Sequence, residues 1–267
     1  MVDSARLYCR YVGISIRAQL QYRAATAMLA VGHLLVTGIE FLAIWALFHR
    51  FGHLRGWSLP QVALLYGMAN SAMALAEGGA RGFDTFASQV KAGTFDRLLL
   101  RPRSTALQVA GQQLQLLRLG RLLQGLAVLG WAAWSLGLSW SPAQVLLLCG
   151  AILGGACLFA GLFVLQGTMA FWTIESLEIV NTLTYGGVET AQYPLAIYAT
   201  WFRRFFTYVI PLACLNYFPA LALTEVHDPL GTPGWVPWVS PLVGVAFLLA
   251  TLQVWRLGVR HYTSTGS

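Results

Sequence analysis

Long apolar stretches with short polar connections between them set the limits on what this chain can fold into. Crossing a bilayer as a helix takes about 20 mostly apolar residues. Stretches of about that length lie at 24–48, 61–79, 122–140, 143–165 and 235–257. Of the 267 residues, 57% are hydrophobic and 10% are charged, whereas a soluble domain carries about 25% charged residues. We therefore predict an all-α integral membrane protein, with one transmembrane domain over residues 1–267.

The positions of the basic residues predict the orientation of the helices. Lys and Arg accumulate on the cytoplasmic side of membrane proteins. If the N-terminus is cytoplasmic, 13 of the 17 basic residues lie inside. The formal net charge of +7 then reflects membrane orientation, and no nucleic-acid partner is expected. Both termini fall inside, which requires an even number of crossings, and we predict six.

Two apolar blocks, 170–190 and 205–224, compete for the remaining crossing, because only one of them can span. The charge rule places Arg203 and Arg204 inside, which makes 205–224 the crossing. Pro211 and Pro219 break that block into short pieces, which favours a re-entrant hairpin packed on protein. Composition alone leaves both arrangements open.

The N-terminal segment 5–22 has the pattern of an amphipathic helix. Arg6, Arg10 and Arg17 fall on one narrow face at helical spacing, and apolar residues cover the rest. Such a helix lies in the membrane interface, with its arginines at the lipid phosphates. Asp3 and the early arginines do not fit a cleaved secretory signal.

Motifs for catalysis are missing from the sequence. A P-loop needs GxxxxGK[ST], yet the only lysine is Lys91, in VKAGTF. The four cysteines have no CxxC pairing and no histidines at metal-ligand spacing. We expect no catalytic residue, no metal site and no cofactor bound by this chain.

The polar segment 81–104 is the most informative part of the chain. Phe83 and Phe86 recur at helical spacing beside Asp84 and Lys91. A short amphipathic helix of this kind suits docking in the groove of a soluble partner. It also suits a helix that lies on lipid, and the residues alone leave both open.

Several acids lie at membrane depth, where ionisable groups usually face the bundle interior or water. Glu40 shares a helical face with His33 and Thr37, and Glu77 shares one with Tyr66 and Asn70. A third stripe comprises Thr168, Glu175, Glu178, Thr182, Tyr185 and Glu189. The candidate translocation path consists of Glu175, Glu178, Thr182 and Glu40. Structural polar contacts are the alternative, and no buried basic partner for these acids is evident.

Small residues follow one another on the fourth apolar stretch. Gly150 and Gly154 form a GxxxG pattern. Because small residues let helix backbones approach closely, we expect this face to pack against a neighbouring helix.

Two sequence segments carry a family resemblance. They are FDRLLLRPRS in the central loop and TYGGVETAQYPLAIYATWFRRFFTYVIPLACLNYFPALAL before the last stretch. With the order of the apolar stretches, they resemble the bacterial ABC type-two (ABC-2) exporter permeases. The closest likeness is to the subfamily whose members are usually encoded beside a second permease and a separate ATPase.

The resemblance implies a six-helix permease in the bacterial inner membrane, paired with a like or different permease and resting on an ABC ATPase. ATP and Mg would bind the ATPase. The coupling helix, Phe83 to Lys91 within the loop 81–104, would dock on it. The expected contacts are Phe83, Asp84, Phe86, Lys91 and Phe95, with Arg97 and Arg101 holding the loop to lipid phosphates or to acids of the ATPase. The region 191–234 would hold an external re-entrant element, which favours 170–190 as the fifth crossing. Arg203 and Arg204 depart from this pattern as external positive charges.

Two alternatives from other classes remain. An ion-coupled secondary transporter would need its intramembrane acids to titrate and would be supported by inverted repeats, of which none is visible. A membrane assembly scaffold would show no transport and would tolerate neutral substitutions in the acidic stripe.

Overall fold

A computed structural model describes residues 13–14, 16–113, 118–138, 140–173, 177–224 and 231–263. Over these residues the chain is helical, and its one β-type contact is an isolated bridge between Leu54 and Trp57. Half of the predicted interfacial helix at 5–22 lies outside the described residues. The part that is described is mainly helical.

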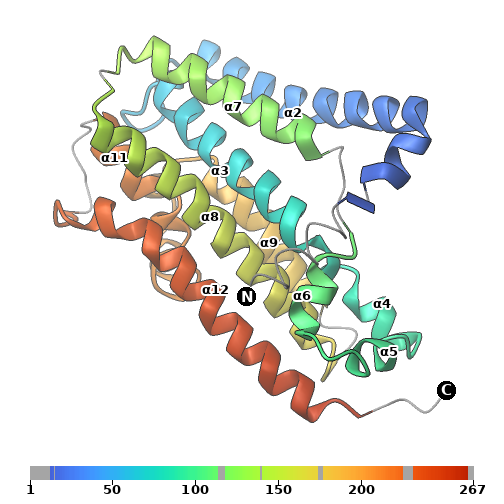
Figure 1. Cartoon of the computed structure of the whole chain (residues 1–267). Coiled ribbons are helices and arrows are strands. Elements are labelled where there is room, and N and C mark those ends of the chain that lie inside the picture. The colour runs from blue at the N-terminus through green and yellow to red at the C-terminus, as the bar shows by residue number, and fades with distance from the viewer. Residues whose placement is uncertain are drawn as a thin grey trace.

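Six helices of 15 residues or more form the body of the protein. They are α2 (Arg23–Phe51), α3 (Leu59–Ala80), α7 (Arg118–Ser135), α8 (Pro142–Met169), α9 (Leu177–Ala191) and α12 (Val236–His261). Figure 1 shows α8 lying along α12 on one side and beside α3 on the other, with α7 and α2 beyond α3. The most extensive contacts are those of α8 with α12 and of α3 with α7. The core therefore sits along α3 and α8.

Short helices form two further segments. The α3–α7 loop contains η1 (Arg81–Phe83), α4 (Phe86–Lys91), α5 (Asp96–Leu99) and α6 (Thr105–Ala110). The segment before α12 contains η2 (Leu195–Ile197), α10 (Thr200–Arg204), the π-helix η3 (Phe205–Val209), η4 (Leu212–Cys214) and α11 (Tyr217–Thr224). The loop therefore folds into helical pieces, and the predicted helix from Phe83 to Lys91 is divided between η1 and α4.

Serine and glutamine define the starts of the two central helices. At the start of α8 the Ser141 hydroxyl accepts from the Gln144 backbone N–H at 3.2 Å, and the Gln144 side chain accepts from the Ser141 N–H at 3.0 Å. At the start of α3 the Ser58 N–H donates to the Gln61 side chain at 2.8 Å. These contacts satisfy N–H groups that the first turn of a helix leaves without partners. Proline in the first turn of each helix suits that position, because proline has no N–H to lose.

Glycines bring the central helices into close contact. A Cβ atom at Gly154 of α8 would overlap the carbonyl of Pro241, and one at Gly244 of α12 would overlap the carbonyl of Gly154. A Cβ at Gly67 of α3 would lie 2.6 Å from Cβ of Leu129 on α7. The packing role predicted for the GxxxG pattern is therefore confirmed at Gly154, which meets the backbone of α12.

Among the residues that the structure describes, three helices are long and apolar enough to cross a membrane, namely α2, α8 and α12. The segments 200–209 and 212–224 pass the same test only as a pair, and they meet at an angle of 74°. The helices α3 and α7 form where spans were predicted, but they are not among these three. The structure therefore supports a multi-helical membrane protein, with three or four candidate spans on apolarity alone.

The predicted block 170–190 does not form one continuous helix. The chain turns at 170–173, and α9 is described from Leu177 to Ala191. The stripe drawn from Thr168 to Glu189 is therefore wrong as a single helical face, because Thr168 belongs to the end of α8. At about 1.5 Å per residue, the 15 residues of α9 reach about 22 Å.

Substitution of Gly154 tests the close contact between α8 and α12. We expect Gly154→Ala to lower stability by about 1–3 kcal/mol, because the added methyl group overlaps backbone that cannot rotate away. Gly130→Ala on α7 is the matched control, since a Cβ there meets nothing within 4 Å. The measurement is the thermal unfolding midpoint of the detergent-solubilised chain. Equal midpoints for the two variants would contradict the packing described here.

Candidate functional site

The α3–α7 loop is held to the protein by an aromatic cluster. Phe83, Phe86 and Phe95 are 2%, 0% and 0% exposed. The ring centroid of Phe86 lies 4.9 Å from that of Phe95 and 4.8 Å from that of Trp255 on α12. Phe95 also contacts Tyr262 at 5.0 Å. Aromatic pairs at such distances add about 0.5–1.5 kcal/mol each beyond their buried area, so the loop is firmly attached.

The position of these rings corrects one prediction. Phe83, Phe86 and Phe95 were predicted to contact the ATPase, but they point into the protein and offer no surface to a partner. Helical spacing grouped Phe83 with Phe86, and in the structure both rings contact Trp255 although they belong to η1 and α4. The spacing could not show that the C-terminal end of α12 covers them.

The end of α12 also contacts the loop through a polar group. Burial raises the pKa of the Tyr262 phenol, and the neighbouring Asp96 carboxylate raises it further. On the α6 side, a Cβ at Gly82 would overlap the carbonyl of Val109. The loop is therefore closely packed on two sides.

The exposed part of the loop lies further along the chain than predicted. Leu100 is 86% exposed and Leu99 is 41% exposed. The predicted contact residues Lys91, Arg97 and Arg101 are also exposed. A basic surface with one prominent leucine is therefore what the loop presents to a partner or to lipid.

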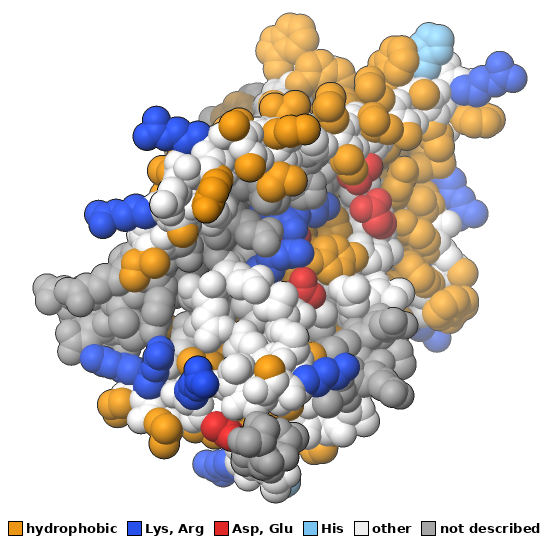
Figure 2. Space-filling model, turned by 90° about the vertical axis from the view of Figure 1, so that its right-hand side faces the viewer, with side chains coloured by type: hydrophobic (Ala, Val, Ile, Leu, Met, Phe, Trp, Pro, Cys, Tyr) orange, Lys and Arg blue, Asp and Glu red, His pale blue; other side chains and the backbone are white. Residues whose placement is uncertain are grey.

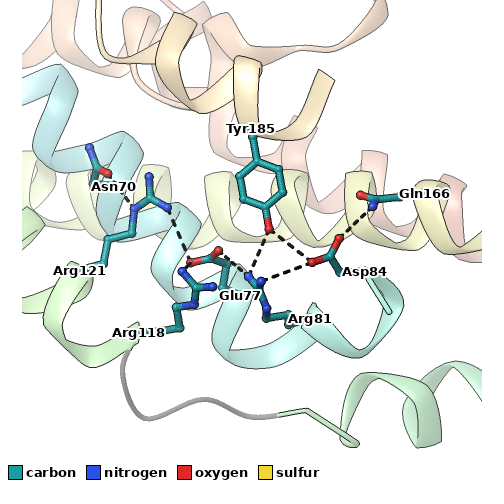
Figure 3. Close-up of polar contacts among 8 residues, drawn as sticks. All are labelled: Asn70, Glu77, Arg81, Asp84, Arg118, Arg121, Gln166 and Tyr185. Atoms are coloured by element: carbon teal, nitrogen blue, oxygen red, sulfur yellow. Dashed lines mark hydrogen bonds and ion pairs between the residues drawn. The ribbon is translucent and has the colours of Figure 1, made fainter. Parts of the chain in front are cut away.

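A buried carboxylate lies next to this loop. Glu77, near the end of α3, is 0% exposed. Its Oε1 lies 2.9 Å from Arg81 Nη1, and its Oε2 lies 3.2 Å from Arg118 Nη1 and 3.7 Å from Arg121 Nη1. Figure 3 shows the three guanidinium groups around this one carboxylate. A carboxylate is costly to bury unless it is paired, so Glu77 requires these partners.

Further polar contacts connect this group to the other helices. Asp84 of the loop lies 3.5 Å from Arg81 and accepts from the Gln166 side chain of α8 at 2.9 Å. The Tyr185 hydroxyl of α9 lies 3.2 Å from Arg81 Nη1 and 3.5 Å from Asp84 Oδ2. We call the following set the Glu77 cluster: Asn70, Glu77, Arg81, Asp84, Arg118, Arg121, Gln166 and Tyr185 (Figure 3).

The Glu77 cluster joins α3, α7, α8, α9 and the loop. Arg121 Nε donates to Asn70 Oδ1 at 2.9 Å, which connects α7 back to α3. Two carboxylates face three guanidinium groups, so the cluster has one positive charge in excess. Figure 2 shows the side of the molecule that lies at the right in Figure 1. Charged side chains of both signs lie in a hollow near the middle of this side, whereas hydrophobic side chains dominate its upper part.

Sequence reasoning missed the partners of Glu77. It placed Glu77 on a polar face with Asn70, but it counted Arg118 and Arg121 only as markers of the cytoplasmic side. The expectation that the acids have no buried basic partner is therefore wrong for Glu77. Two arginines three residues apart at the start of a helix were the available signal, because that spacing puts both on one face.

The predicted translocation path is only partly described. Glu175 and the side chain of Glu178 lie outside the described residues. Thr182 is exposed on α9, and Glu40 of α2 is partly buried. The structure thus does not bring Thr182 into the Glu77 cluster. Within the described ranges, no group of three His, Cys, Asp or Glu side chains could hold a metal ion.

Replacing Glu77 tests the cluster. Glu77→Gln removes the carboxylate that Arg81, Arg118 and Arg121 share, and we expect a loss of about 3–5 kcal/mol in stability. Glu189→Gln on α9 is the control, since that carboxylate is exposed. The measurement is again the unfolding midpoint in detergent, together with Glu77→Gln/Arg118→Gln, which should recover part of the loss. A midpoint for Glu77→Gln equal to that of the control would rule out a structural role.

Comparison with known proteins identifies the family. Residues 34–266 match the family model described as ABC-2 family transporter protein. No curated protein and no solved structure gives a significant match. The matched region covers most of the chain, including the α3–α7 loop, the Glu77 cluster and the segment before α12. The chain is a permease that belongs to the ABC-2 transporter family.

Proposed function

We propose that this chain is the membrane-spanning subunit of an ATP-driven exporter, coupled to a separate ABC ATPase through the α3–α7 loop. The main support is the attachment of that loop on two sides. The aromatic cluster fastens it to the end of α12, and the Glu77 cluster fastens it to α3, α7, α8 and α9. A displacement of the loop would therefore move several helices together, because packed elements transmit displacement rather than absorb it.

The surface offered to the ATPase would be the segment 97–103 rather than the buried phenylalanines. Leu100, at 86% exposure, is flanked by Arg97 and Arg101. An exposed apolar side chain with a basic rim fits an apolar pocket with acidic residues at its edge. Lys91, also exposed on α4, extends the basic rim.

The membrane arrangement in this proposal has six crossings with both termini cytoplasmic, in a bacterial inner membrane. The helices α2, α3, α7, α8, α9 and α12 would be the crossings, and 200–224 would be a re-entrant element outside. The 74° bend and the burial of every residue from 210 to 221 support the last point. Irregular backbone at membrane depth is tolerated only when protein covers it.

The exporter would work by alternating access. ATP and Mg would bind the partner ATPase, and this chain would supply no residue to them. Closure of two ATPase subunits would move the loops and shift a permease pair between inward-open and outward-open states. A nucleotide or substrate shifts that equilibrium only through its different affinities for the two states.

The second permease would contact the apolar surface of α2. Leu29, Leu35 and Ile39 are 61%, 60% and 65% exposed on this helix. The proposed path runs nearby, with Glu40 of α2 and the acids of 175–189 on its wall. Oε2 of Glu40 is buried and has no hydrogen-bond partner among the described residues, which fits a group that a polar substrate contacts.

A reversal of charge at the exposed loop tests the proposed docking. The chain would be co-expressed with the ABC ATPase and the second permease encoded beside it, and purified through a tag on this chain. We expect Leu100→Asp/Arg101→Glu to reduce the co-purified ATPase at least about tenfold, since residues at the centre of an interface carry most of its affinity. The readouts are the ATPase retained and the vanadate-sensitive ATP hydrolysis.

The matched control is Arg256→Glu, an exposed basic position at the same end of the protein but outside the loop. If Leu100→Asp/Arg101→Glu retains as much co-purified ATPase as the wild type, the proposed docking is contradicted. A well-folded wild-type chain that retains no ATPase would contradict the exporter function itself.

A further inference from the structure

A cavity of about 720 Å³ lies between the bent segment 200–224 and the start of α12. Its volume is typical of sites that bind small molecules. Neither the Glu77 cluster nor the α3–α7 loop contributes to its wall. It is therefore a separate site.

The wall of this cavity has a basic end and an apolar end. Arg203 and Arg204 line it together with the hydroxyl groups of Thr200 and Thr207. The apolar part is lined by Phe218, Val236, Val239 and Val243. A ligand that fills both parts must combine an anionic group with a hydrocarbon portion.

The two arginines form no ion pair with any carboxylate among the described residues. Arg203 Nη2 donates to Thr200 Oγ1 at 3.2 Å, which holds its guanidinium group beside the hydroxyl. Arginine presents several N–H donors in a planar fork that matches the oxygens of a phosphate. The basic end is thus arranged to bind a phosphate group.

The cavity lies at the opposite end of α12 from the aromatic cluster. The 26 residues of α12 span about 39 Å at about 1.5 Å per residue, which is close to the full thickness of a bilayer. Trp201, Tyr208 and Trp235 are 72%, 82% and 63% exposed around the cavity. Exposed Trp and Tyr concentrate at the level of the lipid headgroups.

We propose that this cavity binds the headgroup phosphate of an anionic lipid through Arg203 and Arg204, with the acyl chain along Val239 and Val243. The inference accounts for two positive charges on the side of the membrane where the charge rule disfavours them. Its assignment to the outer leaflet rests on the orientation in the proposed function. The binding itself does not, and it can be measured without any ATPase.

The test uses the full chain purified in detergent and offered equimolar phosphatidylglycerol and phosphatidylcholine with identical acyl chains. Native mass spectrometry gives the ratio of the two lipids retained. We expect the wild type to prefer phosphatidylglycerol and Arg203→Gln/Arg204→Gln to lower that preference about tenfold, which corresponds to the loss of one charge-assisted hydrogen bond. Arg203→Lys/Arg204→Lys keeps both charges and should retain part of the preference.

The matched control is Arg50→Gln/Arg55→Gln, which removes two charges from the same predicted side of the membrane but outside the cavity. An unchanged preference in Arg203→Gln/Arg204→Gln, or an equal loss in the control, would overturn the proposal. Displacement of the lipid by soluble glycerol phosphate at a similar concentration would also overturn it, because the site would then bind a free phosphate. Unfolding midpoints of all variants separate loss of binding from loss of fold.

A second variant tests the apolar end. Val243→Trp should fill the apolar end of the cavity, where the acyl chain would lie, and reduce retention of both lipids without removing any charge. If retention is unchanged, the hydrocarbon part of the ligand does not enter the cavity, and the lipid assignment fails. This outcome leaves the docking of the ATPase on the loop untouched.

Discussion

The buried carboxylate of Glu77 is the constraint on which the arrangement of the helices depends. At 0% exposure it has no access to water, and in a low-dielectric interior an uncompensated charge is costly. Its compensation comes from Arg81 at the loop and from Arg118 and Arg121 on α7. The α3 and α7 helices must therefore meet at this depth, and the contact between Gly67 and Leu129 holds the same two helices together further along their length.

The same cluster determines where the loop can lie. Asp84 connects the loop to α8 through Gln166, and Tyr185 connects α9 to the same point. On the other side, the rings of Phe86 and Phe95 pack on Trp255 and Tyr262. The polar contacts specify an orientation because hydrogen bonds are directional, and the aromatic contacts supply most of the buried area. The segment was expected to be a docking helix. Together these contacts hold it tightly as a connection between several helices.

The helix α12 separates two regions of different chemistry. Its C-terminal end packs on the loop, and its N-terminal end borders the cavity that contains Arg203 and Arg204. The contact of Gly244 with Gly154 holds α12 tightly on α8 between these ends. A movement at the loop would therefore reach the cavity through rigid motion of α12 and α8, which gives the two regions a physical connection.

The sequence by itself determined the elements and the family. Apolar stretches predicted the helices α2, α3, α7, α8 and α12, because hydrophobic length is a local property that needs no knowledge of neighbours. The resemblance to the ABC-2 family, carried by the loop and the segment before α12, is confirmed by the match over residues 34–266.

Only the tertiary structure decided which side chains meet. Phe83 and Phe86 have the spacing of an exposed docking face as well as of a buried one, and the end of α12 decides between them. From the sequence, Arg118 indicates only which end of its helix is cytoplasmic. The structure shows that it lies 3.2 Å from Glu77. Periodicity reports which residues share a face of a helix, but what covers that face comes from residues far away in the chain. The chain could thus be assigned to its family from local patterns, whereas its candidate site exists only where distant segments converge.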